Sequence, residues 1–304
     1  LKTLHPNVHG GLLADRDEKS HLNAMEKYNV KEIDLLVVNL YPFAETVRAG
    51  ADYAQCIENI DIGGPAMIRA AAKNFKYVAT LVDIEDYEGL VNELKMNNGC
   101  TSYSFRQKLS QNAFSLSAYY DAMVSNWMLD NITGVKPRRF SISAALSQDL
   151  RYGENPHQSA SFFLDENLQV GIGASNQIQG KQLSYNNIND TDAALELVNE
   201  FPQNDGAAAV IVKHANPCGV GVANSLVEAY RSAFSCDKTS AFGGIVALNR
   251  IIDEESAREI IKVFTEVVVA PGITEGARQI FSSKSNLRLL ITEQSSDQAC
   301  SAKV

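Results

Sequence analysis

Apolar runs of strand length alternate with segments of helical composition along this chain, and this alternation constrains the fold more than any other feature. The strand-length runs are 33–40, 77–82, 207–213, 244–248 and 267–270. The helical segments between them are 51–60, 65–75, 225–235 and 253–264. Because strands that alternate with helices pair side by side in parallel, the sequence predicts an α/β fold with parallel sheets.

A polar stretch near the middle of the chain predicts a domain boundary. Residues 131–139 contain Asn, Gly, Pro and three basic side chains without apolar periodicity. The segment before it, 104–129, carries aromatic and aliphatic residues at helical spacing, which indicates a core-facing helix rather than a cofactor site. We therefore expect two domains, 1–133 and 140–304.

Composition and charge narrow the classes of partner. The net charge of −9 argues against nucleic acid, whose partners usually carry a basic face. No apolar run approaches the roughly 18 to 20 residues that span a bilayer. The first 30 residues are too polar for a secretory signal. We expect a cytoplasmic protein that binds neither nucleic acid nor membranes.

Cysteine and histidine spacing gives no sign of a metal site. The five cysteines form no CxxC pair, so reduced thiols are expected. Of the five histidines, only His5 and His9 lie close together, and no cysteine or acidic cluster joins them. The sequence therefore predicts that no metal is bound.

The apolar run 207–213 ends in a lysine and a histidine, which marks a candidate site. Open α/β sheets bind ligands beyond the carboxyl ends of their strands. Neighbouring side chains on a strand point to opposite faces, so Lys213 and His214 can share a site only if the chain turns after His214. The segment Asn216-Pro217 and Gly219 are expected to form that turn.

Two segments of the first half also collect polar groups. The run 33–40 ends in an Asn-Leu-Tyr-Pro-Phe sequence, and Pro42 stops strand pairing there. Asp61 and two glycines precede Pro65 at a helix start, where a ligand can approach backbone N–H groups. Lys73 lies about 12 Å further along that helix, and geometry alone favours a solvated lysine.

In the second half, residues 151–158 and 184–192 are rich in polar and turn-forming residues. Arg151 can bind a phosphate or carboxylate in bidentate fashion, and Tyr152 can cover a flat heterocycle; an ordinary polar loop is the alternative. Helix capping by Asp190 or Thr191 explains part of the second segment.

Six motifs then resemble, in order, the bifunctional AICAR transformylase/IMP cyclohydrolase family of purine biosynthesis. They are Lys-Thr-Leu-His-Pro at 2–6, Asn-Leu-Tyr-Pro-Phe at 39–43, Ile-Asp-Ile-Gly-Gly at 60–64, Ala-Ala-Lys-Asn at 71–74, Arg-Tyr-Gly-Glu-Asn-Pro-His-Gln at 151–158 and Lys-His-Ala-Asn-Pro-Cys-Gly at 213–219. The resemblance implies a methylglyoxal-synthase-like parallel-sheet domain, followed by part of a transformylase region with cytidine-deaminase-like units. It covers essentially the whole chain.

The resemblance implies a multifunctional transferase and hydrolase with two sites. AICAR would receive a formyl group from 10-formyltetrahydrofolate as co-substrate, and formyl-AICAR would then cyclise to IMP with loss of water. The cyclohydrolase residues implied as catalytic are Lys2, Tyr41, Asp61 and Lys73. Those implied to line its nucleotide are Thr3, Val38, Asn39 and Ile62. Lys73 thereby changes from a solvated lysine to a proton donor or acceptor.

For the transformylase, the resemblance implies His214 as proton acceptor and Lys213 as the group that stabilises developing charge. Histidine titrates near neutral pH, which suits a group that accepts and releases a proton. The residues implied to bind AICAR are Arg151, Tyr152, Gly243, Glu266 and Asn189. Neither reaction requires a metal, and the family's homodimer, with sites built across subunits, is implied as well.

The resemblance also implies that the chain is a fragment. The family's Ser-Thr-Gly-Gly-Thr phosphate loop would precede Leu1, and further AICAR and folate contacts would follow Val304. Two other functions stay open from the sequence. A noncatalytic nucleotide-binding module would not need the Lys213-His214 pair, whereas a thiol hydrolase would use Cys218 with His214 but lacks an evident helix start or third orienting residue.

Overall fold

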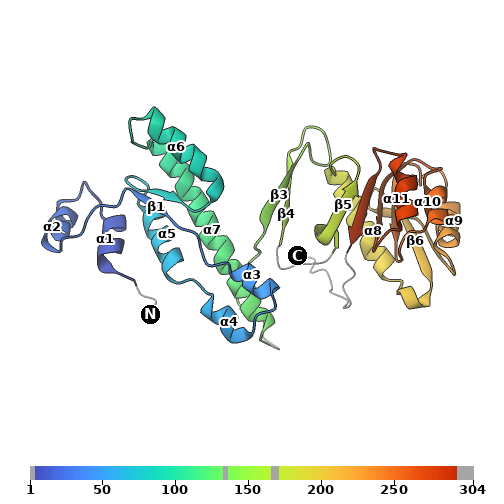
Figure 1. Cartoon of the computed structure of the whole chain (residues 1–304), viewed down its shortest axis with the longest axis horizontal. Helices are drawn as coiled ribbons and strands as arrows, with labels where there is room; N and C mark the ends of the chain where they lie inside the picture. Colours follow the sequence, from blue (N-terminus) through green and yellow to red (C-terminus); the bar gives the residue numbers. More distant parts are fainter. Residues whose placement is uncertain (1–3, 133–135, 166–170, 293–304) are drawn as a thin grey trace. The chain divides into compact units, whose positions relative to one another are not determined.

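The computed structural model describes residues 4–132, 136–165 and 171–292, and the chain divides into two compact units. Unit 1 is Leu1–Ala144 and unit 2 is Ala145–Val304. Figure 1 shows both units, coloured along the sequence. Each unit mixes helices with a sheet that contains parallel strands, so the predicted α/β class is confirmed.

Unit 1 is mostly helical around one small sheet. Its helices are α1 (Pro6–Leu13), α2 (Lys19–Lys27), α3 (Phe43–Arg48), α4 (Tyr53–Glu58), α5 (Gly63–Lys73), α6 (Tyr87–Met96) and α7 (Tyr103–Asp130), with the 3-10 helix η1 (Ile84–Asp86). Strand β1 (Leu35–Val37) pairs in parallel with β2 (Ala79–Leu81). Both strands are shorter than the apolar runs that predicted them, and Leu35 and Val37 on β1 remain 41% and 45% exposed.

The core of unit 1 covers both faces of this sheet. On one face, Leu12 of α1 and Ala71 of α5 pack with Val78. On the other, Leu81 of β2 packs with Leu90 of α6 and Leu109 of α7. Helix α5 thus packs against α1, the sheet and α7. It begins at Gly63, within the turn from Asp61 to Gly64.

Unit 2 is built on a six-stranded sheet of order β5-β10-β9-β8-β6-β7. Its strands are β5 (Ser175–Gln179), β6 (Ala207–Lys213), β7 (Asn216–Ala223), β8 (Gly244–Leu248), β9 (Thr265–Ala270) and β10 (Arg288–Thr292). Its helices are α8 (Tyr185–Asn199), α9 (Leu226–Cys236), α10 (Glu254–Ile260) and α11 (Glu275–Ser282), with 3-10 helices η2 (Gly171–Ala174) and η3 (Gln203–Asp205). A separate antiparallel pair consists of β3 (Ala145–Leu150) and β4 (Ala160–Leu164).

Helices cover both faces of the six-stranded sheet. Leu195 and Val198 of α8 pack on one face against Val210 and Val269. Helices α9, α10 and α11 pack on the other face, where Phe281 of α11 is fully buried. Figure 1 shows α8 separated from α9, α10 and α11 by the strands. Unit 2 is therefore a three-layer arrangement, and its strands β6, β8 and β9 are almost continuously apolar because both of their faces are buried.

The expected direction of the site strand was wrong in one respect. Strands β8, β9 and β10 are parallel to one another, but β6 is antiparallel to β8. The carboxyl end of β6 therefore lies at the edge where β8, β9 and β10 begin, and not beside their carboxyl ends. The cause is the β6–β7 hairpin, which reverses the chain before helix α9 and was not visible in the alternating pattern.

The turn after β6 also differs from the expectation. Lys213 pairs with Asn216, so His214 and Ala215 alone form the turn, and Asn216, Pro217 and Gly219 belong to β7. Gly219 has a different role, because a Cβ there would lie 2.0 Å from the carbonyl oxygen of Ala233 in α9. Its missing side chain permits close packing of α9 on β7.

Candidate functional site

The β6–β7 turn presents His214 at the edge of the unit 2 sheet. His214 and Ala215 have φ angles of +56° and +54°, the two positive values of a type I′ hairpin turn. The turn is exposed, and Asn216 Nδ2 donates to the His214 carbonyl at 2.7 Å. Because the backbone reverses at His214, its side chain is freed from the strict alternation of the strand, as the proposed shared site requires.

Lys213, the last residue of β6, lies beside the loop that leads into β8. Its Nζ donates to the Phe242 carbonyl oxygen at 2.9 Å. Gly243 follows with φ +76°, and its N–H donates to the Phe264 carbonyl at 2.7 Å. The register pairs Val212 with Ile245, so Lys213 and the Phe242–Gly243 loop meet at one sheet edge. Two predicted site residues, Lys213 and Gly243, are brought together in this way.

Glu266 reaches the same edge from β9. The β8–β9 register pairs Gly244 with Thr265 and then Ile245 with Val267, which leaves Glu266 as the extra residue of a bulge. Its Oε2 accepts from Asn187 Nδ2 at 3.0 Å and from Arg288 Nη1 at 3.2 Å. Adjacent strands lie about 4.8 Å apart, so two strand spacings, about 10 Å, separate Glu266 from Lys213.

Helix α8 connects three segments of this site. Ser184 and Asn187 form a capping box at its start, so the predicted cap at Asp190 or Thr191 was wrong. Asn186 Nδ2 donates to the Glu154 carbonyl at 3.4 Å, Asn187 contacts Glu266, and Asp190 accepts from the β6–β7 turn. The first turns of one helix thus hold a loop, a bulge and a hairpin.

Arg151 and Tyr152 lie in the loop between β3 and β4. The Arg151 guanidinium carbon lies 4.9 Å from the centre of the Tyr152 ring, and Nη2 lies 3.3 Å from the Tyr152 hydroxyl. The loop closes through a 2.9 Å hydrogen bond from the Gly153 N–H to the Gln158 carbonyl. Arg151 is exposed and Tyr152 half-buried, so the pair offers a cation and an aromatic ring to one ligand.

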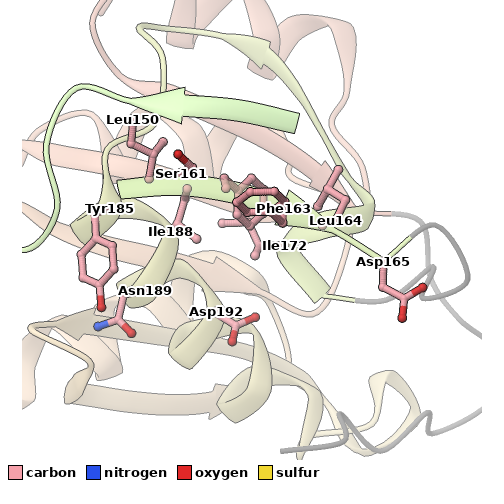
Figure 2. A pocket seen from close by; sticks show the side chains of 12 residues that line it. Leu150, Ser161, Phe163, Leu164, Asp165, Ile172, Tyr185, Ile188, Asn189 and Asp192 are labelled. Carbon is pink, nitrogen blue, oxygen red and sulfur yellow. The ribbon is translucent and has the colours of Figure 1, made fainter. Parts of the chain in front are cut away.

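Asn189 faces a different surface of α8. It lines a hollow of about 390 Å³ between α8, the β3–β4 pair and η2, together with Tyr185 and Asp192. Figure 2 shows Asn189 beside Tyr185 on the helix, with Phe163 and Ile172 across the hollow. Asn189 therefore points away from the face that carries Asn187 and Asp190, since successive helical residues differ by about 100°.

In unit 1, Asp61 joins two of the predicted segments. Its Oδ2 accepts from the Tyr41 N–H at 3.3 Å and its Oδ1 from the Gly64 N–H at 2.9 Å. The Tyr120 hydroxyl accepts the Asp61 N–H at 2.8 Å. Gly64 is required because a Cβ there would lie 2.7 Å from both Asp61 and Leu40. The Gly64 N–H is therefore already bound, rather than open to a ligand as the glycine pair suggested.

The other predicted unit 1 residues divide between two places. Val38 extends β1 through a 3.1 Å hydrogen bond to the Leu81 carbonyl, with Asn39 exposed next to it, and Ile62 is 64% exposed beside Asp61. Lys73 is the exposed last residue of α5, about 15 Å along the helix from Gly63. The structure thus separates Lys73 from Asp61 and Tyr41 by the length of α5. Lys2 and Thr3 lie outside the described residues.

Sequence reasoning missed Asn187 and Asp190 as site residues. Both lie on α8, and their i, i+3 spacing places them on one face. The signal was present in the Ser184-x-x-Asn187 capping pattern, which starts the helix six residues before Asp190. Placing the cap later hid the shared face.

No three His, Cys, Asp or Glu side chains gather as a metal site within the part of the chain that the structure describes. No helix of the described ranges is long and apolar enough to cross a bilayer. Burial, reinforced by Asp237, raises the pKa of the Cys218 thiol, which disfavours the thiolate that a thiol hydrolase needs.

Two family models match the chain, and together they cover most of both α/β units. A model described as an MGS-like domain matches residues 2–66, and one described as the AICARFT/IMPCHase bienzyme matches residues 71–304. The chain belongs to the AICARFT/IMPCHase bienzyme family. The junction between the two matches falls within α5, so unit 1 contains residues of both.

Relatives agree with this membership. The chain is 61% identical over 293 residues to the bifunctional purine biosynthesis protein PurH of Dinoroseobacter shibae, covering 96% of this chain and 55% of that protein. It is 58% identical over 293 residues to PurH of Ruegeria pomeroyi, with the same coverage. The chain thus spans about half the length of the curated relatives it matches.

One solved structure, described as the crystal structure of ForH, is 36% identical to the chain. The match covers 42% of the present chain and 66% of the ForH chain, with a TM-score of 0.36.

Proposed function

We propose that the full-length protein to which this chain belongs catalyses the last two steps of IMP synthesis. The first step transfers a formyl group from 10-formyltetrahydrofolate to the amine of AICAR. The second closes formyl-AICAR to IMP with loss of water. Residues 140–304 carry the transformylase and residues 1–133 the cyclohydrolase. Family membership and relatives named as bifunctional purine biosynthesis proteins support this assignment.

In the transformylase, His214 accepts the proton that the AICAR amine loses as it attacks the formyl carbon. The C–N bond to the folate then breaks, and the folate nitrogen takes up a proton. Lys213 stabilises the negative charge that develops on the formyl oxygen. One of the three Lys213 N–H groups binds the Phe242 carbonyl, which orients the ammonium at the sheet edge.

AICAR binds across the same edge. Arg151 pairs with its phosphate, Tyr152 covers its ring, and Glu266 and Gly243 contact its polar edge. The Glu154–Asn186 and Glu266–Asn187 hydrogen bonds support this grouping, because both link the segments through α8. Asn189 is a weaker member of the set, since it lines the hollow on another side of that helix.

In the cyclohydrolase, the carboxamide nitrogen of formyl-AICAR attacks its own formyl carbon, and water leaves. The family resemblance supports proton movement and oxyanion stabilisation by Tyr41, Lys73 and Lys2, with Asp61 ordering the site, although α5 separates Lys73 from Asp61 and Tyr41. Thr3, Val38, Asn39 and Ile62 line the nucleotide. Both reacting groups belong to one molecule, so selecting a folded conformer supplies much of the acceleration.

The observation that carries the proposal is the placement of Lys213 and His214 at the edge that Gly243 and Glu266 also reach. A noncatalytic nucleotide-binding module has no need of this pair. Under the same proposal, the protein binds small molecules and neither nucleic acid nor membranes, and catalysis needs no metal. The protein is a homodimer in the cytoplasm.

The test uses the full-length protein, because the chain spans about half of its relatives. His214→Ala is expected to lower formyl transfer about 10²- to 10⁴-fold, the usual value of a positioned base. Cyclisation of supplied formyl-AICAR is expected to continue at the unsubstituted rate, as measured by IMP absorbance. Retained transfer would refute His214 as the base, and a protein without either activity before substitution would favour the noncatalytic module.

A further inference from the structure

Asp190 makes two contacts that the proposed chemistry does not use. Its Oδ2 accepts from the His214 N–H at 3.0 Å, and its Oδ1 accepts from the Ala215 N–H at 2.8 Å. Both carboxylate oxygens are thus directed at the two central residues of the β6–β7 turn. Charge-assisted hydrogen bonds of this kind are about twice as strong as neutral ones.

The turn needs this support because of its sequence. A type I′ turn requires positive φ at both central positions, and Asn-Gly or Gly-Gly usually occupies them. Here a histidine and an alanine adopt φ +56° and +54°, where a Cβ crowds the backbone. Histidine enters this region more readily than most residues but alanine does not, so the turn gains from a partner outside the hairpin.

Helix α8 gives Asp190 a fixed position from which to do so. The capping box of Ser184 and Asn187 starts the helix, and Ala194 and Leu195 are buried beyond Asp190. Asn187, one turn earlier on the same face, binds Glu266. The separation between the His214 turn and Glu266 is therefore set by one rigid helix.

We propose that Asp190 is the positioning residue of the formyl-transfer site: its carboxylate holds the His214-Ala215 turn so that the His214 imidazole meets the substrate amine. This inference rests on the proposed function. The two printed contacts of this carboxylate are both with backbone N–H groups, one to each oxygen, so the role assigned to Asp190 is to hold the turn. Its contribution is geometric, and a shift of about 1 Å in a reacting group can cost about 100-fold in rate.

The experiment compares substitutions in the full-length protein. Asp190→Ala removes both acceptors and is expected to lower kcat for formyl transfer about 100-fold, with KM for AICAR changed less than about threefold. Asp190→Asn keeps one acceptor and is expected to lose about tenfold. The matched control is Glu200→Ala, which removes an exposed carboxylate from the other end of α8 and leaves the transfer rate unchanged. Cyclisation of supplied formyl-AICAR stays unchanged in all three variants.

A rescue separates positioning from simple loss of structure. Glycine adopts positive φ without the Cβ penalty, so adding Ala215→Gly to Asp190→Ala is expected to recover transfer at least about fivefold. Full activity of Asp190→Ala, an effect on KM alone, or no recovery in the double variant would overturn the positioning role. Should Asp190→Ala fail to fold, Asp190→Asn decides, and unaltered kcat there would also overturn it. Absence of transfer before any substitution would instead refute the proposed function.

Discussion

Each unit uses one aspartate to hold the backbone beside a proposed catalytic side chain, but the two arrangements differ in what they connect. Asp190 binds the N–H groups of two adjacent residues, His214 and Ala215, from a separate helix. Asp61 joins Tyr41 to Gly64, a residue in the first turn of the helix that follows it. The first carboxylate stabilises an unfavourable turn, whereas the second ties a strand exit to a helix start.

The surroundings differ as well. In unit 2 the turn lies at the edge of a six-stranded sheet, and among the described residues helices cover both faces of that sheet. In unit 1 the strand that leads to Tyr41 has three residues and leaves Leu35 and Val37 about half exposed. An aspartate can therefore hold a site backbone beside a large sheet, as in unit 2, or beside a two-stranded parallel sheet, as in unit 1.

The largest test of this comparison concerns Lys73, which lies at the far end of α5 from Asp61. Lys73→Ala in the full-length protein is expected to lower cyclisation of formyl-AICAR about 10²- to 10⁴-fold, because a proton donor or acceptor is lost. Formyl transfer should be unchanged when assayed separately with 10-formyltetrahydrofolate. Equal loss of both activities would indicate misfolding. Retained cyclisation would refute the catalytic role of Lys73 and leave it as a solvated surface lysine.

A smaller effect is expected from Asp61→Ala. The substitution removes the acceptor of the Gly64 N–H at the start of α5 and of the Tyr41 N–H, so unit 1 should lose about 2 kcal/mol of unfolding free energy. Chemical denaturation followed by the fluorescence of Trp127, which packs with Phe43 and Tyr53 in unit 1, measures this loss. Asp61→Asn, which keeps one acceptor, should lose less. An unchanged midpoint for both would show that the clamp contributes nothing to folding.

The closed core of unit 2 predicts a pH effect. Burial, with a smaller contribution from Glu259, raises the pKa of Tyr230 to about 12 from 10.0. The unfolded phenol ionises first, so the stabilisation is complete below pH 10 and is lost as the pH rises toward 12, at about 1.4 kcal/mol per pH unit. Urea unfolding at pH 9, 10 and 11 should show a steeper loss for the unsubstituted protein than for Tyr230→Phe. Parallel pH profiles would contradict the buried neutral phenol.

The smallest expected effect is a gain from Ala215→Gly. Glycine reaches φ +54° without steric cost, so the free energy of unfolding should rise by about 1 kcal/mol, or a few degrees in melting temperature. Ala49→Gly serves as a control, because Ala49 has φ −71° and should lose stability instead. A loss at position 215 would mean that the Asp190 clamp leaves no strain in the turn.

The sequence predicted more of the fold than of the site geometry. The runs 207–213, 244–248 and 267–270 became β6, β8 and most of β9, because strands buried on both faces are apolar throughout. Strand β7 was missed, since Asn216, Pro217 and Gly219 are typical turn residues. Its pairing with β6 reversed the expected direction of the site strand relative to β8.

By itself, the sequence determined the class of fold and the family and singled out candidate site residues, since apolar periodicity and motif order are local properties of the chain. Tertiary structure alone decided which of these residues meet. It placed His214 in a left-handed turn under Asp190, turned Glu266 toward Asn187 through a bulge, and set Lys73 at the far end of α5. Such contacts join residues 20 or more positions apart, and their geometry depends on strand register and helix packing, which no local pattern specifies.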